Sequence, residues 1–503
     1  MATRRGDMTV DRLSLRTLSQ VPPSRQPRVD PRGLGVGIVH LGIGAFHRAH
    51  QAEFTEDAVA ARGGDWGICG VTQRSPSVVA QLMPQDGLYT LVTRGPSTVD
   101  ARVIGAVRAV LFAGSDPVAA RLADPAVRVV TLTVTEKGYR HDPASGRLRV
   151  DDPALRADLA GDASPRTVVG QIVRGLEARM RGDAGPVTVL SCDNLAHNGR
   201  TLAGLVDDFV TLVPAGRPLA SWIAENVRFP SSMVDRIVPA TTPADHEDVR
   251  RLIGLDDEGA VVTEPFRQWV IEDDFPAGRP AWDAAGALFT DDVTPYEVMK
   301  LRMLNGAHSA LAYLGALAGC ETIATTMAYE AFAIVAQRLI HDDARPTLDP
   351  PPAGIDLDEY ERQLLERFAN PALRHRTVQI AMDGSQKLPQ RLLSTLRARR
   401  VAGESPRWAA LAVAAWMRWV WADRVDDGTP RALDDPLAPV LQQAVSGSAS
   451  AADVVDRLLG VREVFGDDLR DDPVVRGLLT DALEQLAAAG ALGAAAAVVK
   501  GAP

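Results

Sequence analysis

The hydrophobic pattern of this chain changes character once, close to residue 290. Up to that point short β-rich runs alternate with helix-like stretches, and beyond Thr294 amphipathic segments rich in alanine and leucine take over. Alternation of strands and helices is typical of a parallel sheet covered by helices. A chain of 503 residues is also longer than one hydrophobic core usually supports. We therefore expect an α/β domain over residues 1–288 and a mostly α-helical domain over residues 289–503.

The expected elements follow from the spacing of apolar residues. In the first domain we expect strands at 35–41, 66–71, 129–134 and 186–191, and helices at 45–61 and 164–181. Ser164 is a suitable N-cap for the last of these helices, and Pro165 suits its first position. In the second domain we expect helices at 296–319, 321–340, 356–369, 405–422 and 475–499.

A glycine turn joins the first expected strand to the first expected helix. Gly42 and Gly44 would let the backbone approach a pyrophosphate, and the helix N-terminus would supply N–H donors. The third glycine of the usual dinucleotide fingerprint is replaced by His47, and the fragment alone fits a plain strand-to-helix turn equally well. In its context the turn favours a Rossmann-like parallel-sheet domain. Its candidate cofactor contacts are Gly42, Ile43, Gly44, Ala45 and Phe46.

The choice between NAD and NADP stays open at this level. An acid at the end of the second strand normally binds the ribose of NAD, but residues 70–77 contain no acid. Asp65 precedes that strand and so lies on the wrong side of it, whereas Arg74 could accept a 2′-phosphate.

Charge and composition argue against several classes of partner. The net charge of −10, without a basic patch among aromatics, argues against nucleic acid. No apolar run reaches the roughly 18 residues that span a bilayer, so we expect no membrane partner. The charged residues 1–7 are followed by no apolar stretch, so we expect no signal peptide. Cys69, Cys192 and Cys320 are far apart, which suits free thiols in a cytoplasmic protein.

Two histidines after the glycine turn raise a metal hypothesis. His47, His50 and Glu53 are spaced three residues apart on the expected helix. No matching group of ligands occurs elsewhere in the sequence. We therefore favour a helix face near phosphates and expect no metal.

Lysine is scarce in this chain. Of 54 basic residues, only Lys137, Lys300, Lys387 and Lys500 are lysines. Arginine holds its proton at any usable pH, whereas a desolvated lysine can release one. A lysine retained among so many arginines is a candidate for work that arginine cannot do. Lys300 lies in the apolar helix expected at 296–319, and we interpret it as a catalytic acid/base.

That helix carries four polar side chains on one side. At about 100° per residue, Lys300, Glu297, His308 and Asn305 fall at roughly 0°, 60°, 80° and 140°. A surface stripe with an ion pair between Glu297 and Lys300 would explain the spacing as well. Methionine, leucine and alanine surround the rest of the helix, so we expect it to be buried. Burial lowers the pKa of a lysine toward neutrality.

Two further segments are unusually polar for structural turns. Residues 191–198 place Asn194 directly after an expected strand, and residues 382–391 contain Lys387. Either could be a tight loop with satisfied side chains. Amides at the carboxyl end of a strand in a Rossmann-like sheet more often meet a ligand.

Several motifs together resemble the mannitol dehydrogenase family of long-chain polyol and uronate dehydrogenases. They are Gly-Ile-Gly-Ala-Phe-His-Arg-Ala-His at 42–50, Ser-Cys-Asp-Asn at 191–194, Phe-Pro-Ser-Ser-Met-Val-Asp-Arg-Ile-Val-Pro at 229–239, Glu-Pro-Phe-Arg-Gln-Trp at 264–269, and the spacing of Lys300, Asn305 and His308. The likeness runs from about residue 35 to the end. It implies zinc-independent hydride transfer between a secondary alcohol and nicotinamide, with NAD as cofactor and NADP not excluded.

The same resemblance implies roles around the reacting carbon. Lys300 would be the general acid/base, Asn194 and Asn305 would hold the developing oxyanion, and His308 would orient the substrate. Further roles are implied for Glu297, on the proton path, and for Asp235 and Lys387, on substrate hydroxyls.

Two branches of the family compete for the substrate. Mannitol 2-dehydrogenases commonly carry an arginine where this chain has Gln379, and an acidic pair where it has Pro76 and Ser77. Residues 267–273 and 370–391 instead resemble the fructuronate reductases, or D-mannonate oxidoreductases. A uronate needs a cation for its carboxylate. The candidates are Arg302, Arg374, Arg376 and Arg391.

We therefore expect an enzyme that interconverts a 2-keto sugar acid and a sugar acid, D-fructuronate and D-mannonate. One alternative is a mannitol 2-dehydrogenase, acting on D-mannitol and D-fructose, or another polyol dehydrogenase. A remote alternative is a nucleotide-binding regulator without turnover, although such a protein would be expected to lose the lysine or the asparagines. Nothing in the sequence favours a monomer over a homo-oligomer.

Overall fold

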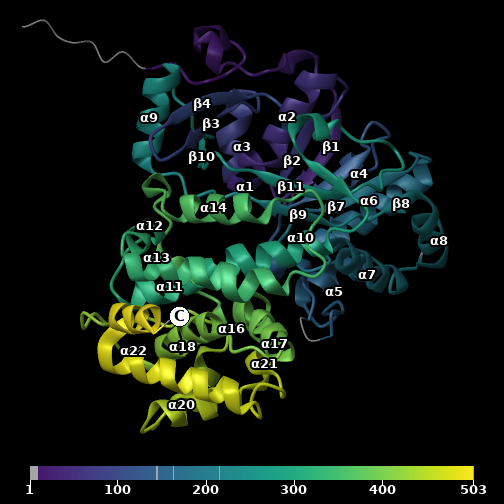
Figure 1. Cartoon of the computed structure of the whole chain (residues 1–503). Coiled ribbons are helices and arrows are strands. Elements are labelled where there is room, and N and C mark those ends of the chain that lie inside the picture. Colours follow the sequence, from purple (N-terminus) through teal and green to yellow (C-terminus); the bar gives the residue numbers. More distant parts are fainter. Residues whose placement is uncertain (1–9, 143–144, 162–163, 215, 502–503) are drawn as a thin grey trace, which may run out of the picture. The chain divides into compact units, whose positions relative to one another are not determined.

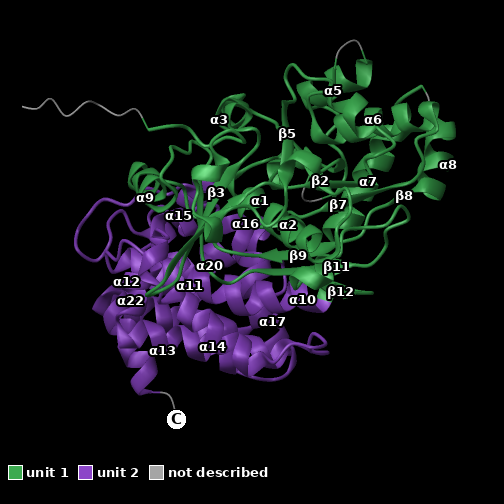
Figure 2. Cartoon of the chain, turned by 90° about the horizontal axis from the view of Figure 1, so that it is seen from above, with its two compact units in different colours: residues 1–294 green, residues 295–503 purple. Residues whose placement is uncertain are grey.

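The parallel sheet that the sequence predicts is present in the computed structural model. The structure describes residues 10–142, 145–161, 164–214 and 216–501, so residues 1–9 of the polar N-terminal segment lie outside the described residues. The chain forms two units, residues 1–294 and 295–503 (Figure 2).

Six parallel strands form the main sheet of the first unit, in the order β5-β2-β1-β6-β7-β8 (Figure 1). Their bounds are β1 Val36–Leu41, β2 Gly67–Thr72, β5 Val107–Phe112, β6 Val129–Leu132, β7 Val187–Ser191 and β8 Val227–Arg228. Numbered along this sheet alone, the order is 3-2-1-4-5-6, that of a doubly wound dinucleotide-binding fold. The predicted Rossmann-like fold is confirmed.

Most α-helices of the first unit lie between strands of the main sheet along the chain, whereas α9 lies beside the sheet β10-β3-β4 (Figure 1). They are α1 Ala45–Ala49, α2 Gln51–Arg62, α3 Ser77–Leu82, α4 Val118–Leu122, α5 Pro153–Ala160, α6 Val168–Gly182, α7 Asn198–Thr211, α8 Gly216–Asn226 and α9 Pro243–Ile253.

Both helices that the sequence predicts in this unit differ from the prediction. The helix expected at 45–61 is broken at His50, where φ is −133° and ψ is −87°, so that α1 and α2 are separate. The helix expected from Ser164 begins at Val168, because Thr167 is the N-cap. Its hydroxyl accepts the N–H of Gly170 at 3.1 Å and donates to Asp158 at 2.6 Å.

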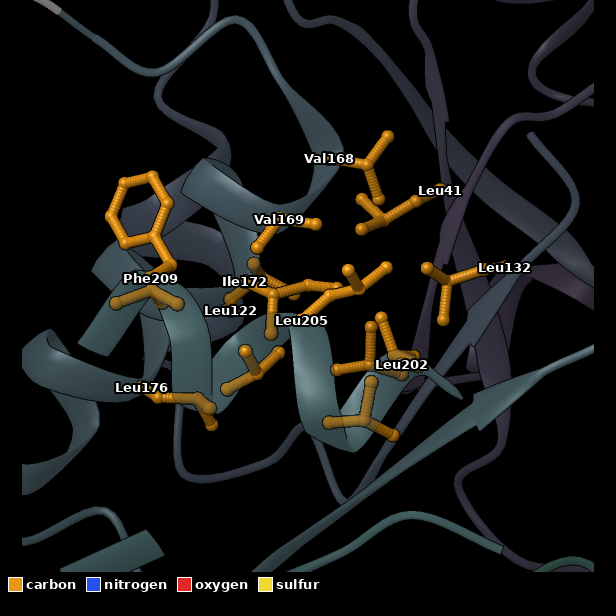
Figure 3. Packing of buried hydrophobic residues seen from close by; sticks show 14 of the residues in the cluster. Leu41, Leu122, Leu132, Val168, Val169, Ile172, Leu176, Leu202, Leu205 and Phe209 are labelled. Atoms are coloured by element: carbon orange, nitrogen blue, oxygen red, sulfur yellow. The ribbon is translucent and has the colours of Figure 1, made fainter. Parts of the chain in front are cut away.

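Apolar side chains cover both faces of the main sheet, because successive strand residues point to opposite sides. On one face, Leu41 and Leu132 pack against α6 and α7 (Figure 3). On the other, Ile38 belongs to a cluster with Phe54 of α2. Burial on both faces explains why the strands read as continuous apolar runs. Each fully buried valine or leucine stabilises the fold by about 1.5–3 kcal/mol.

Two three-stranded sheets, which the sequence did not predict, complete the first unit. Their orders are β10-β3-β4 and β12-β11-β9. The bounds are β3 Tyr89–Arg94, β4 Val99–Ile104, β9 Ser232–Asp235, β10 Val261–Thr263, β11 Gln268–Glu272 and β12 Leu288–Thr290. The strands β9, β10 and β12, of three or four residues each, carry too few residues for periodicity to distinguish them from loops.

The second unit is built from helices in the residues that the structure describes, which confirms the predicted helical half (Figure 1). They are α10 Thr294–Met299, whose first residue belongs to the first unit, α11 Gly306–Leu317, α12 Ile323–Met327, α13 Glu330–Arg338, α14 Leu357–Phe368, α15 Thr377–Ala381, α16 Gly384–Leu388, α17 Ser394–Val401, α18 Arg407–Trp421, α19 Ala438–Val445, α20 Ala451–Leu459, α21 Arg462–Phe465 and α22 Pro473–Lys500.

The segment expected as one helix at 296–319 is not α-helical throughout. A π-helix, η7 Lys300–Asn305, separates α10 from α11, and the N–H of Gly306 donates to the carbonyl of Leu301, five residues back. The assumption of 100° per residue is therefore wrong across η7, because a π turn is wider than an α turn. π-Helical turns are rare and occur frequently at functional sites.

The helix α22 corrects the expectation that no segment is apolar enough to cross a bilayer. By length and composition α22 qualifies among the described residues, although a third of its most apolar window is buried. Its backbone leaves the helical region at Gly490, where φ is 68° and ψ is 176°, and the next N–H, of Ala491, donates to Asp426 at 2.7 Å. Such a helix is weak evidence for a membrane span, because core helices meet the same criteria.

Candidate active site

The glycine turn after β1 has the geometry for close backbone approach. Gly42 has a φ of +101°, and a Cβ there would lie 2.1 Å from the carbonyl oxygen of Thr133, so glycine is required. Gly44 has an ordinary negative φ of −91°, and the nearest atom to a Cβ there would be 3.8 Å away. Nothing in the described chain demands glycine at 44, which leaves that side of the turn open to a ligand. The turn thus fits a dinucleotide at the carboxyl edge of the sheet.

His47 occupies the place of the missing third glycine by packing inward. Its ring stacks on that of His40, with centroids 3.5 Å apart, and both side chains are fully buried. The break at His50 ends α1 after five residues, so the helix need not approach the sheet as closely as a third glycine allows. His50 directs Nε2 at the carbonyl of Gln268, 2.9 Å away, and burial lowers its pKa to about 3. Burial also lowers the pKa of His47 well below its ordinary value.

The loop after β2 leaves Arg74 exposed. Its neighbour Gln73 exchanges two side-chain hydrogen bonds with Gln171 of α6, at 3.1 and 2.9 Å, which anchors the loop to the sheet's helical layer. A role for Arg74 in contacting the cofactor stays a prediction.

Asn194 lies exposed in the turn after β7, beside a buried carboxylate. That carboxylate, of Asp193, accepts the N–H groups of Val134 at 3.0 Å and Thr135 at 2.8 Å, and the hydroxyl of Tyr139 at 2.8 Å. Burial raises the pKa of Asp193, and these donors oppose the rise. The turn that carries Asn194 is therefore tied to the loop after β6.

Asp235 ends β9 and is buried. It lies opposite Gln268 of β11 in the antiparallel pair. The adjacent Arg236, also buried, donates to the carbonyl of Glu264 at 2.9 Å and pairs with Glu53, which fixes the backbone that follows Asp235.

The second unit carries Lys300, Asn305 and His308 on one continuous helical segment. Lys300 is the first residue of η7, Asn305 is its last, and His308 lies in the first turn of α11. All three are buried, as is Glu297 of α10, so the alternative of a surface stripe is wrong. Asn305 follows Lys300 by five positions, the spacing of a π-helical hydrogen bond, and this places both on one side of the segment.

His308 is held between two rings. Phe368 stacks on one side, with centroids 5.3 Å apart, and His375 meets the ring at 4.9 Å. Nε2 of His308 is buried without a hydrogen-bond partner among the described residues. A buried polar atom of this kind is suited to a ligand or to water.

Basic side chains surround His308, and burial lowers the pKa of one of them, His375, to about 4. Burial first, and then the charges of His375, Arg391, Arg367 and Lys387, lower the pKa of His308 well below its ordinary value. Arg391 donates to the hydroxyl of Ser309, the residue next to His308, at 3.2 Å. The imidazole is therefore neutral at pH 7 in surroundings that favour negative charge.

Lys387 is fixed by the turn between α15 and α16. Its Nζ donates to the carbonyl of Met382 at 2.5 Å and to that of Ile380 at 3.3 Å. Gly384 makes this turn possible, because a Cβ there would lie 2.4 Å from the indole nitrogen of Trp416. Two backbone carbonyls thus help to place the ammonium group.

The other candidates for carboxylate binding are placed less favourably. Arg302 donates to the carbonyl of Thr347 at 2.8 Å, while Arg374, Arg376 and Gln379 are exposed. Of the four arginines, Arg391 has a contact beside His308.

Sequence reasoning missed three features of these sites. It assigned no role to Asp193, although an acid directly after a buried strand is itself a signal. It missed the π-helix at Lys300, for which no local signal exists. It also missed His375, whose contact with His308 joins segments that are distant in the chain.

Two family models match most of the chain. The mannitol dehydrogenase Rossmann domain matches residues 36–284, and the mannitol dehydrogenase C-terminal domain matches residues 292–487. The chain belongs to the mannitol dehydrogenase family.

Individual members of the family match over nearly the whole chain. D-mannonate oxidoreductase of Escherichia coli (strain K12) is 44% identical over 93% of this chain and 97% of its own length. The uncharacterized oxidoreductase YeiQ of the same strain is 45% identical over 92% and 95%. The structure of Pseudomonas fluorescens mannitol 2-dehydrogenase with NAD and D-mannitol matches with a TM-score of 0.86 and 37% identity, covering 97% of this chain and 99% of that chain.

These findings confirm the predicted family and the predicted class of enzyme, an oxidoreductase acting on CH–OH groups. The predicted use of NAD is confirmed at the level of the family, one solved member of which holds NAD. Both D-mannonate oxidoreductase and mannitol 2-dehydrogenase are among the relatives, so the family alone leaves the substrate open.

We expect activity to survive prolonged chelation. Among the residues that the structure describes, no group of three or more His, Cys, Asp or Glu side chains is arranged to hold a metal ion. The measurement is NADH oxidation after dialysis against EDTA, with and without added zinc. Loss of activity that zinc restores would contradict acid/base catalysis by Lys300 and would support the hypothesis that His47 and His50 bind a metal ion.

Proposed function

We propose that this protein is an NAD(H)-dependent reductase of a keto sugar acid, which interconverts D-fructuronate and D-mannonate without zinc. The observation that supports this substrate class is the group of basic side chains around His308, which are Arg391, Arg367 and Lys387. A buried carboxylate gains a charge-assisted contact from arginine that a neutral hydroxymethyl group cannot make. The alternative, a mannitol 2-dehydrogenase, is supported by the likeness to the Pseudomonas fluorescens enzyme.

In this proposal the first unit binds the cofactor and the second supplies the acid/base. We assign residues 1–288 to dinucleotide binding and residues 289–503 to catalysis. The open side of the turn at Gly44 and the backbone from Gly42 to Phe46 would hold the pyrophosphate, and Arg74 would lie near the ribose. Bound NADH supplies the hydride that reduces the keto carbon.

The chain's own residues handle the oxygen of the reacting carbonyl. In reduction, Lys300 donates a proton to the keto oxygen as the hydride reaches the carbon, and a secondary alcohol results. The amide groups of Asn194 and Asn305 donate hydrogen bonds to that oxygen while its negative charge develops. Lys300 then regains a proton along a path lined by Glu297. In oxidation, Lys300 takes the proton of the alcohol.

The remaining contacts fix the sugar chain. The buried Nε2 of His308 orients the hydroxyl or keto oxygen at the reacting end. Asp235 and Lys387 bind hydroxyl groups. Arg391, beside Ser309, meets the carboxylate, with Arg302 and Gln379 as further substrate contacts.

We expect D-fructuronate to be reduced with at least about tenfold higher kcat/KM than D-fructose, a difference of about 1.4 kcal/mol. The expectation follows from the cationic surroundings of His308. The measurement is NADH oxidation with fructuronate, tagaturonate and fructose at one pH and ionic strength. A higher kcat/KM for fructose, or faster oxidation of mannitol than of mannonate, would instead establish a mannitol 2-dehydrogenase.

Substitution of Arg391 tests the proposed contact with the substrate carboxylate separately from hydride and proton transfer. Arg391→Gln should raise KM for fructuronate about tenfold or more while changing KM for fructose little. Arg362→Gln is the matched control, because Arg362 pairs with Glu359 and Glu366 on an exposed face of the same unit. An equal effect of Arg391→Gln on both substrates would mean that Arg391 does not bind the carboxylate.

The state of the cysteines indicates the cellular compartment in which the enzyme works. Cys69, Cys192 and Cys320 are all free and buried. Free thiols persist in a reducing environment. On this ground we place the enzyme in the cytoplasm.

A further inference from the structure

The loop after β6 lies between the glycine turn and the turn that carries Asn194. On one side, the hydroxyl of Thr133 donates to the carbonyl of Gly42 at 2.9 Å, and His40 reaches the same hydroxyl at 2.8 Å. On the other side, the N–H groups of Val134 and Thr135 donate to Asp193. One short loop is thus bonded to both proposed parts of the first unit's site.

The backbone of this loop is strained where Asp193 holds it. Thr135 has a φ of 64° and a ψ of 159°, a region that is essentially restricted to glycine. A β-branched residue such as threonine keeps this strained backbone conformation only when several contacts around it enforce the conformation. The hydrogen bond from the Thr135 N–H to Asp193, at 2.8 Å, is one of these contacts.

The turn of Asn194 is held from its other side as well. The side-chain amide of Asn198 donates to the backbone carbonyl of Asp193 at 2.9 Å and to that of Ser232 at 2.7 Å. Tyr139 completes the arrangement, because its hydroxyl contacts both the Asp193 carboxylate at 2.8 Å and the Ser191 hydroxyl at 2.6 Å. Asp193 is therefore bonded through its side chain and its backbone at once.

We propose that Asp193 is the positioning residue that fixes the Asn194 amide relative to the glycine turn, by joining the turn after β7 to the loop after β6. The proposal rests on the proposed role of Asn194. It goes beyond that role because the carboxylate of Asp193 is buried and bonded to protein donors, so that Asp193 would act through the geometry of its neighbour. Three donors, the N–H groups of Val134 and Thr135 and the hydroxyl of Tyr139, converge on the buried carboxylate of Asp193 and join it to the loop after β6.

The test compares Asp193→Asn with Asn194→Ala in the full-length protein, singly and together. An amide at 193 keeps the size of the carboxylate but replaces one acceptor oxygen with a donor that faces the backbone N–H groups. We expect Asp193→Asn to lower kcat by about 10²-fold, as loss of one oxyanion donor does. NADH affinity, measured by fluorescence titration, should stay within about threefold, and the double variant should be little worse than Asn194→Ala alone.

Asp257→Asn is the matched control. Asp257 is also a buried carboxylate of the first unit that accepts backbone N–H groups, from Thr90 and from Gly259. It lies at the sheet β10-β3-β4 rather than at the carboxyl edge of the main sheet. We expect this variant to lower the Tm but to leave the kcat of the folded enzyme near normal.

The outcomes separate the two proposals. A near-normal kcat for Asp193→Asn beside an impaired Asn194→Ala would overturn the role of Asp193 and leave that of Asn194 intact. Independent, multiplying losses in the double variant would also overturn it. A fully active Asn194→Ala would instead overturn the proposed role of Asn194. If Asp193→Asn does not fold, Tyr139→Phe removes one donor alone, and a lowered Tm with unchanged kcat would count against the inference.

Discussion

We expect Lys300→Arg to lower kcat by about 10²–10⁴-fold, the range typical for loss of general acid/base catalysis. Lys300 is buried at the start of η7, where bulk water has little access. We therefore expect that water does not replace Lys300 in the proposed proton transfer. Arginine keeps the positive charge but cannot release a proton at any usable pH. The measurement is kcat for ketone reduction, together with a fluorescence titration of NADH, whose affinity should be unchanged.

The same substitution elsewhere serves as the control. Lys500→Arg changes an exposed lysine at the end of α22 and should leave kcat and Tm unchanged. Near-normal turnover in Lys300→Arg would remove the acid/base assignment. A loss of both turnover and NADH binding would instead indicate damage to the fold around η7, and Lys300→Met would then be compared for stability.

Asn305→Ala should lower kcat by about 10²–10³-fold, equivalent to about 2.7–4 kcal/mol of transition-state stabilisation. The reason is that an amide donor aimed at the oxygen contributes most when negative charge develops there. Because Asn305 is the last residue of η7 and Lys300 the first, we expect the two to act from one side of the same π-helical segment. The measurement is kcat and kcat/KM with the ketone substrate, both of which should fall by similar factors.

Asn226→Ala provides the comparison for Asn305→Ala. Asn226 ends α8, and its amide donates to the carbonyl of Trp222 at 3.0 Å, which is a purely local contact. That variant should lose some stability and no turnover. A rise in KM at constant kcat for Asn305→Ala would mean that the amide binds substrate and transition state equally, and the oxyanion role would be wrong.

The regular elements were predictable where a local signal was strong. The runs at 35–41, 66–71 and 186–191 became β1, β2 and β7, because strands buried on both faces are long apolar runs. Helix boundaries were less predictable. Ser164 and Pro165 offered a plausible start for α6, but Asp158 binds Thr167 and makes it the cap instead.

The candidate site was predictable as a set of residue types and less so as a geometry. The rarity of lysine identified Lys300 from the sequence, and its burial is confirmed. The angles assigned to Glu297, Asn305 and His308 were not reliable, because they assumed an unbroken α-helix. The histidines after the glycine turn were considered as metal ligands, yet His47 stacks on His40 and His50 bonds to a backbone carbonyl.

The sequence by itself determined which half of the chain forms a parallel sheet, where the glycine turn after the first strand lies, and which residues are candidates for catalysis. These properties are recorded in periodicities and short motifs, which depend on neighbours in the chain. Only the tertiary structure decided that a π turn interrupts the helix at Lys300, where Gly306 packs so closely on the carbonyl of Arg391 that a Cβ would lie 2.8 Å from it. The tertiary structure alone decided that Asp193 bonds to the loop after β6. Contacts between residues so far apart along the chain produce no pattern in the local sequence.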